Sequence, residues 1–185
     1  MVQQSLHDAE ERMKKSREVL GRELAGIRTG RASPSLLEEL RVDYYGTPTP
    51  LKQIASITAP EPRLLVIQPW DRTAIPQIER AILKSDLGLN PASDGTILRL
   101  NIPTLTEDRR RELARLVRKR VEEDRIALRN VRRDAQDHLR RLLKEKQVSE
   151  DEERRAIDQL QKLMEHALGE VDKLGAAKEA EVMEV

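Results

Sequence analysis

The stretch TEDRRRELARLVRKRVEEDRIALRNVRRDAQDHLRRLLKEKQV, residues 106–148, decides the fold because it predicts one long helix with two different faces. Its apolar residues recur every seven positions, and a second set fills the gaps: Ala114, Val121, Leu128, Ala135 and Leu142, then Leu113, Val117, Val131 and Leu139. This heptad pattern is typical of a helix that packs against other long helices. Thr106 is suited to cap the helix, and the two acidic residues after it favour a helix start.

The side of this helix next to the apolar positions is rich in arginine. On a helical wheel that advances about 100° per residue, these arginines fall within roughly 60° of one another. They are named here the arginine flank: Arg111, Arg118, Arg125, Arg129 and Arg132. Guanidinium groups suit two-pronged contacts with phosphate, so the flank predicts an RNA-binding surface.

Two other interpretations of the arginine flank stay open. Residues 106–148 hold 15 Lys and Arg against 9 Asp and Glu, whereas residues 149–185 hold 5 against 11. The two segments can therefore pair as helices and neutralise each other. A charged flank can also be a solvated face that binds nothing. Because aromatic residues make up only 2% of the chain, any RNA would be bound through its backbone and shape rather than by base stacking.

Two further heptad segments predict helices that complete an antiparallel three-helix bundle. The first covers residues 3–29 and ends at the stop Thr29-Gly30. The last begins at Ser149, which forms a capping box with Glu152, and its end is expected to fray over residues 178–185. The repeating positions are Leu6, Met13, Leu20 and Ile27 in the first helix and Ile157, Met164 and Val171 in the last.

The period changes between the first two helices, where the sequence predicts a small inserted β/α/β domain. Strands are expected over residues 40–45, 51–58, 63–68 and 96–102, and a helix over 73–85, with loops at 46–50 and 86–91. The fold class is therefore α+β, with one discontinuous domain of residues 1–30 and 105–185 and an inserted domain of residues 31–104.

Proline-containing passages join the two domains, and they predict a hinge. Such a double linker allows limited movement, although rigid packing of the two domains is the alternative. The predicted hinge residues are Gly30, Arg31, Ala32, Ser33 and Pro34 in the first passage and Ile102, Pro103 and Thr104 in the second.

Composition argues against several other classes of protein. The chain has no Cys, and its three histidines are far apart in sequence. It has no glycine-rich phosphate-binding loop and no pattern of an activated nucleophile. We therefore expect no enzyme activity, no cofactor and no metal. The first residues lack an apolar signal core and no apolar run is long enough to span a membrane, so a cytoplasmic protein without membrane contact is expected.

Four separate motifs resemble those of bacterial ribosome recycling factors, in the same order and over nearly the whole chain. They are RTGRASP at residues 28–34, DYYGTPTP at 43–50, SDLGLNP at 85–91 and RNVRRDA at 129–135. The resemblance implies an L-shaped, monomeric translation factor without enzymatic activity, whose outline approximates transfer RNA. Its bundle would lie on large-subunit ribosomal RNA and its inserted domain would point toward the small subunit. With elongation factor G, it would split the post-termination ribosome and free it from messenger RNA.

The same resemblance implies which residues contact RNA. Five of them match the motifs residue for residue, Arg110 lies in the similar segment 105–110, and Arg125 is added from the wheel alone. The full set is Arg28, Arg31, Arg110, Arg125, Arg129, Arg132 and Arg133. The alternative is a coiled-coil adaptor, or a general RNA-binding helical protein, which the heptads and the arginine flank would equally allow.

Overall fold

The longest helix, α3 (Glu107–Lys144), lies where the heptads predict it in the computed structural model, which describes residues 1–184. The predicted caps are confirmed. The hydroxyl of Thr106 accepts the backbone N–H of Arg109 at 3.2 Å. Helix α4 (Glu150–Met183) follows a short turn, and Ser149 and Glu152 exchange backbone-to-side-chain hydrogen bonds of 2.8 and 3.2 Å. The helix continues to Met183, past the point where fraying is predicted.

Helix α1 (Val2–Ala25) ends four residues before the predicted stop. Gly26 follows its last residue, and glycine is about 1 kcal/mol less favourable than alanine inside a helix. The predicted stop at Thr29-Gly30 is therefore wrong, because the earlier glycine ends the helix. Thr29 is buried instead, and its hydroxyl donates to Oε1 of Glu181 at 2.9 Å.

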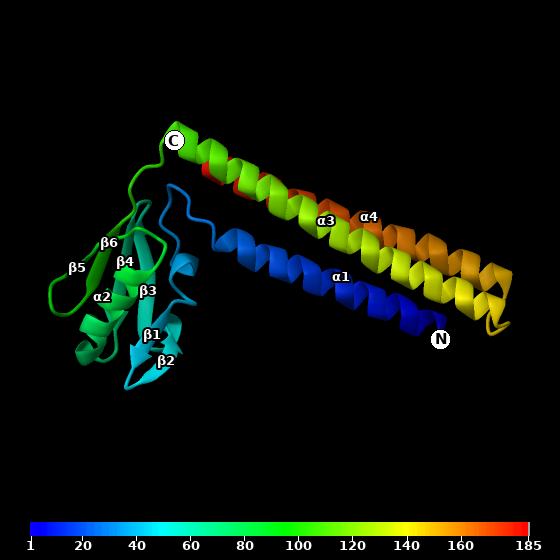
Figure 1. The fold of residues 1–185 in the computed structure, drawn as a ribbon, viewed down its shortest axis with the longest axis horizontal. Helices are drawn as coiled ribbons and strands as arrows, with labels where there is room; N and C mark the ends of the chain where they lie inside the picture. The colour runs from blue at the N-terminus through cyan, green and yellow to red at the C-terminus, as the bar shows by residue number, and fades with distance from the viewer. Residues whose placement is uncertain (185) are drawn as a thin grey trace. The chain divides into compact units, whose positions relative to one another are not determined.

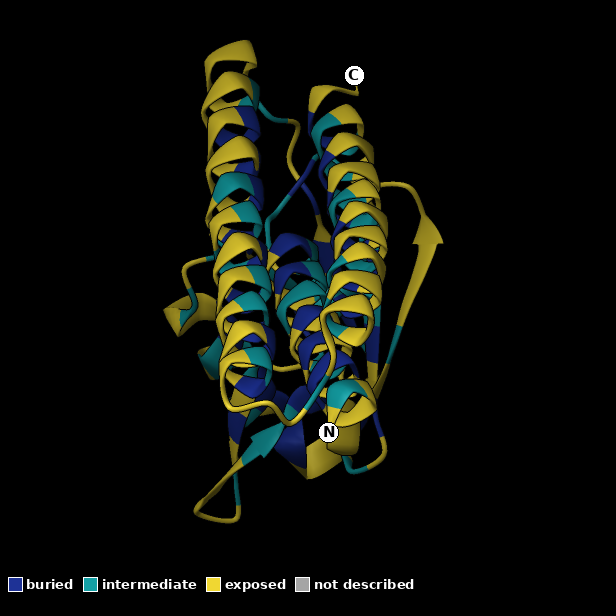
Figure 2. Cartoon of the chain, turned by 90° about the vertical axis from the view of Figure 1, so that its right-hand side faces the viewer, coloured by how far each residue is buried: buried dark blue, intermediate teal, exposed yellow. Residues whose placement is uncertain are grey.

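The three long helices form an antiparallel bundle, as predicted (Figure 1). Between α1 and α3, Arg12 bonds Asp134 at 2.8 Å, and Ser5, closer to the start of α1, lies 3.0 Å from Nδ1 of His138, farther along α3. The residue numbers of the contacts therefore increase along α3 as they decrease along α1. The two helices run in opposite directions. Buried residues follow the inner sides of the helices and exposed ones the outer sides (Figure 2). The apolar seam therefore holds the bundle together.

One ionisable group lies inside this bundle. Asp124 on α3 is only 8% exposed, and Ser16 on α1 donates a hydrogen bond to its Oδ1, while Oδ2 has no partner. Burial raises the pKa of Asp124 above its ordinary value. A buried polar contact of this kind fixes one alignment of two helices against others that apolar packing alone would permit.

The inserted segment holds six short strands and one helix. Strands β1 (Arg41–Tyr44) and β2 (Thr47–Pro50) form a hairpin. An antiparallel sheet in the order β3-β4-β6-β5 contains β3 (Ala55–Glu61), β4 (Leu64–Pro69), β6 (Leu98–Asn101) and β5 (Pro91–Ser93). Helix α2 (Ile75–Lys84) and three single-turn 3₁₀ helices, Pro34–Leu36, Leu51–Gln53 and Arg72–Ala74, complete it. Its core is aliphatic and includes Leu37, Val42, Leu65, Ile67, Ile78, Ile82, Leu98 and Leu100.

The structure corrects three predictions in this segment. Residues 46–50 are not all loop, because Thr47–Pro50 pairs with β1; proline is tolerated where a strand has a free edge. The strand predicted to start at Leu51 starts at Ala55, after a single 3₁₀ turn. Pro91–Ser93 is a strand that the sequence does not predict. The predicted α+β class, a three-helix bundle with an inserted β/α/β segment, is confirmed.

Contacts divide the chain into two units. The helical unit comprises residues 1–24 and 112–180, and the sheet unit comprises residues 25–111 with the chain from Glu181 onward. The predicted hinge residues all lie inside the sheet unit. Ala32 donates its N–H to the carbonyl of Pro62 at 2.7 Å, and Ile102 donates to the carbonyl of Arg63 at 2.8 Å. Movement at these residues stays a prediction.

Two glycines of α4 provide a test of the bundle core. A Cβ on Gly175 would lie 2.6 Å from Cγ2 of Val121, whereas one on Gly169 would meet no heavy atom within 4 Å. We expect Gly175→Ala to lower the free energy of unfolding by about 1–3 kcal/mol through overpacking. Gly169→Ala should raise it by up to about 1 kcal/mol through helix propensity. Urea unfolding measures both, and equal stability of the two variants would contradict the described α3–α4 packing.

Candidate RNA interface

Two members of the arginine flank are bound to α4. Arg125 donates to Oδ1 of Asp172 from Nη2 at 2.6 Å and from Nε at 3.1 Å. Arg118 donates to Glu179 from Nε at 2.9 Å and also from Nη2. These carboxylates raise the pKa of both guanidinium groups above the ordinary value. For Arg118 and Arg125, therefore, the interpretation that the two helices pair through opposite charges is confirmed.

Two other members bind carboxylates of α3 itself. Both terminal nitrogens of Arg129 lie 3.3 Å from Oε1 of Glu122, whose other oxygen accepts from Arg125 at 3.2 Å. Arg111 pairs with Glu107, one turn earlier. Exposed pairs of this kind contribute only about 0–1 kcal/mol each. A phosphate oxygen can therefore replace Glu122 at Arg129 at little cost.

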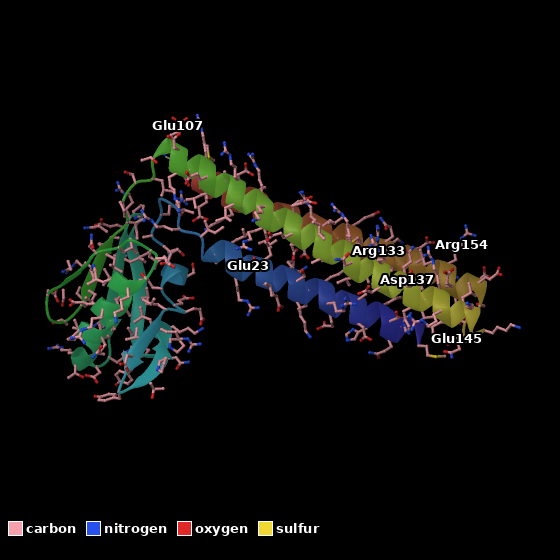
Figure 3. All side chains as sticks on the ribbon, viewed as in Figure 1. Glu23, Glu107, Arg133, Asp137, Glu145 and Arg154 are labelled. Atoms are coloured by element: carbon pink, nitrogen blue, oxygen red, sulfur yellow. The ribbon has the colours of Figure 1, made fainter. Side chains whose placement is uncertain are left out.

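Arg132 and its neighbour Arg133 are different, because neither side chain has a hydrogen-bond or ion-pair partner among residues 1–184. Arg132 is half-buried beside the apolar seam, and its Nε is buried without a partner. Arg133 is exposed, and its side chain points away from the bundle (Figure 3). Each guanidinium has five N–H donors in a plane. Together with Arg129, these two residues form the part of the bundle best suited to bind phosphate.

Arg28, in the sheet unit, already uses its terminal nitrogens for internal contacts. It donates to the carbonyl of Leu87 at 3.0 Å and to the carbonyl of Pro103 at 3.4 Å, and its Nε is buried. Burial, and then the neighbouring charge of Arg109, lower its pKa below the ordinary value. The side chain thus ties together two loops that are 16 residues apart in sequence. Sequence reasoning gave Arg28 an RNA contact and missed this structural role.

The other two predicted contacts of the sheet unit lie at one cavity of about 390 Å³. Arg31, Arg63 and Arg110 line it together with Glu181 and Glu184. Arg31 bonds Glu184 at 2.5 Å, so a phosphate that reached Arg31 would compete with a carboxylate. The predicted set is therefore spread over both units, with Arg28, Arg31 and Arg110 in the sheet unit and the other four residues in the helical unit.

Two features are absent from the part of the chain that the structure describes. Within residues 1–184, no cluster of three or more His, Asp or Glu is placed to hold a metal ion. In the same range, no helix is both long and apolar enough to cross a membrane.

Comparison with known proteins gives the family. The sequence model of ribosome recycling factor matches residues 20–183. The chain belongs to the ribosome recycling factor family. The ribosome-recycling factor of Thermomicrobium roseum is 57% identical over 185 residues, and that of Dehalococcoides mccartyi (strain CBDB1) is 54% identical; both matches cover 100% of each chain.

Solved structures of ribosome recycling factors have the same fold. A solution structure matches with a TM-score of 0.82 and 46% identity, covering 100% of this chain and 98% of the other. A model of the T. thermophilus ribosome recycling factor, bound with E. coli elongation factor G to the E. coli post-termination complex, matches with a TM-score of 0.72 and 49% identity, covering 100% of both chains.

Glu122 and Asp172 are the residues of this interface that sequence reasoning missed. Glu122 lies three residues before Arg125 and seven before Arg129, a spacing that places all three on one side of a helix. The sequence therefore contained a signal for Glu122. Asp172 could not be found in that way, because its contact with Arg125 depends on how α3 and α4 align.

Arg28 and Arg31 form a matched pair for testing the internal role of Arg28. Arg28→Met keeps the apolar stem but removes the donors to two carbonyls, so it should destabilise the sheet unit by about 1–3 kcal/mol. Arg31→Met breaks one exposed ion pair and should cost less than about 1 kcal/mol. Amide hydrogen exchange should show faster opening of residues 85–91 in Arg28→Met only. Unchanged hydrogen exchange of residues 85–91 in Arg28→Met would contradict the proposed role of Arg28 in joining the two loops.

Proposed function

We propose that this chain splits post-termination ribosomes into subunits together with elongation factor G, so that ribosomes leave messenger RNA and are used again. The observation that carries the proposal is the match to ribosome recycling factors over the full chain, both in sequence and in fold. A relative of the same fold occupies the post-termination complex together with elongation factor G. Ribosomes work in the cytoplasm, and we place the protein there.

The RNA-binding surface is assigned to Arg129, Arg132 and Arg133 of α3. Among residues 1–184, two of these guanidinium groups have no hydrogen-bond or ion-pair partner, and the third is held by one exposed carboxylate, so all three can turn terminal N–H donors to phosphate oxygens. Arg125 is a supporting residue, because Asp172 and Glu122 occupy it. The other three predicted contacts, in the sheet unit, stay candidates for RNA at a different part of the ribosome.

Charge reversal on opposite sides of α3 tests this surface. Arg132→Glu should weaken binding to purified large ribosomal subunits at least about tenfold, because it replaces a phosphate contact by repulsion. Arg141→Glu is the matched control, since it lies nine residues away, on the opposite side of the helix at about 180°, and is exposed. Co-sedimentation at several salt concentrations measures both variants.

The salt dependence gives the second part of this test. Wild-type affinity should fall as salt rises, and Arg132→Glu should lower the slope because fewer counterions are released. Circular dichroism checks that the half-buried position tolerates the change, and Arg133→Glu repeats the test at an exposed position. If Arg132→Glu and Arg133→Glu both bind as the wild type does, the arginine assignment is wrong.

We also propose that the two units move relative to each other during splitting. The absence of Cys from the sequence makes the movement testable, because one introduced cysteine in each unit can be cross-linked without side reactions. A reductant-cleavable linker should preserve large-subunit binding and slow splitting at least about tenfold, since a locked protein cannot follow a moving partner. Cleavage of the linker should restore the rate. Splitting at full rate by the linked protein would exclude the movement.

A further inference from the structure

The three aromatic residues of this chain all belong to the sheet unit, and two of them are in ring contact. The sequence has two Tyr, one Trp and no Phe. Tyr44 ends β1, and Tyr45 lies in the turn of the β1–β2 hairpin (Figure 1). Their rings meet edge to face at 4.6 Å, and both hydroxyls donate to Oδ2 of Asp71 at 3.2 Å. Trp70 is the residue immediately before Asp71. These four residues are named the aromatic patch.

Two rings of the aromatic patch are on the surface, whereas Tyr44 is half-buried and packs against the core. Tyr45 is 80% exposed and Trp70 is 68% exposed, while the core of the same unit is made of aliphatic side chains. An exposed Trp ring and an exposed Tyr ring do not stabilise the fold by burial. Tyr and Trp are, however, the side chains that most often dominate the binding energy of protein interfaces.

The backbone at Tyr45 supports a role outside the fold. Tyr44 pairs with Thr47, so Tyr45 and Gly46 form a two-residue hairpin loop, with φ angles of 51° and 78°. A loop with positive φ at both residues favours Asn, Asp or Gly at its first position. A bulky residue with positive φ is uncommon. The backbone of this turn therefore suits asparagine better than tyrosine. Within the fold, the Tyr45 side chain contacts Tyr44 and Asp71 but stays 80% exposed.

The charge of Asp71 favours a cationic protein over RNA as the partner of the aromatic patch. Asp71 accepts the N–H of Thr73 at 2.9 Å and its hydroxyl at 2.6 Å, and these bonds hold its pKa below the ordinary value. Asp71 is thus negatively charged at neutral pH. An anion beside ring faces attracts a cation and repels phosphate. Arg72 is the one basic residue next to the patch in sequence, in contrast to the clustered arginines of α3. RNA is therefore the less suitable partner.

We propose that the aromatic patch is a docking surface for a protein that presents an arginine or lysine side chain. The cation lies against the exposed rings and is neutralised by Asp71. The proposal rests on the proposed function, because the partner is a protein met in the post-termination complex, but it uses a surface separate from the arginines of α3.

Three variants of the full chain test the docking surface. Tyr45→Asn suits the turn and removes the ring, and Trp70→Ala removes the second exposed ring. Leu83→Ala is the control, because Leu83 is a 60% exposed apolar residue of α2 in the same unit. With purified post-termination ribosomes and elongation factor G, the first two variants should slow subunit splitting at least about tenfold. Trp70→Ala and Leu83→Ala should keep the wild-type melting temperature. Tyr45→Asn should stay close to it, because the better turn geometry offsets the lost contacts of the ring with Tyr44 and Asp71.

Binding to isolated large subunits separates this proposal from the proposed function. The aromatic variants should bind large subunits as the wild type does, while Arg132→Glu binds weakly. Splitting at the wild-type rate by Tyr45→Asn and Trp70→Ala would overturn the docking surface and leave the function standing. If the wild type itself neither binds nor splits ribosomes, the function fails instead.

A photo-cross-linking experiment shows whether the partner of the aromatic patch is a protein or RNA. A benzophenone amino acid replaces Trp70, and the protein is irradiated in the same purified mixture of ribosomes and elongation factor G. An adduct to a protein segment that contains Arg or Lys, abolished by Tyr45→Asn, supports the proposal. An adduct to ribosomal RNA, or no adduct while splitting proceeds, overturns it.

Discussion

The apolar seam of α3 is the constraint on which the rest of the helical unit depends. Its buried residues pack between α1 and α4, and this fixes the rotation of α3 about its axis. The direction of every other α3 side chain then follows from its angle to the seam. Arg118 and Arg125 reach carboxylates of α4, whereas Arg133 points to solvent. Core packing therefore decides which arginines are available to a partner.

Long periodic elements could be predicted from the sequence, and short paired ones could not. The start of α3 and both helix caps follow from local chemistry at Thr106, Ser149 and Glu152, which the structure confirms, whereas α3 ends at Lys144, four residues before the predicted end at residue 148. The end of α1 was wrong because two glycines follow in close succession, and the sequence alone does not show that the first suffices. Strands β2 and β5 were missed because they depend on partners elsewhere in the chain and contain proline, which disfavours a strand in isolation.

The candidate site, too, could be predicted only in part from the sequence. A wheel finds the arginines that share a side of α3, because that depends only on spacing. It cannot tell Arg125 from Arg132, which are about 20° apart, since the difference is made by Asp172 on another helix. Nor can it show that Arg28 is occupied by the carbonyls of Leu87 and Pro103. Residue type predicted the chemistry of the site, and tertiary contacts decided which residues remain available for it.

The pairing of Arg118 and Arg125 with α4 affects how strongly the protein can bind RNA non-specifically. Non-specific affinity for RNA grows with the number of phosphates that a protein neutralises, so a fully open stripe of arginine would hold the protein on any abundant transcript. Internal carboxylates reduce that number while leaving a small cluster free. Under the proposed assignment of RNA contacts, the protein therefore dissociates quickly from other RNA and stays available for the ribosome that has finished translation.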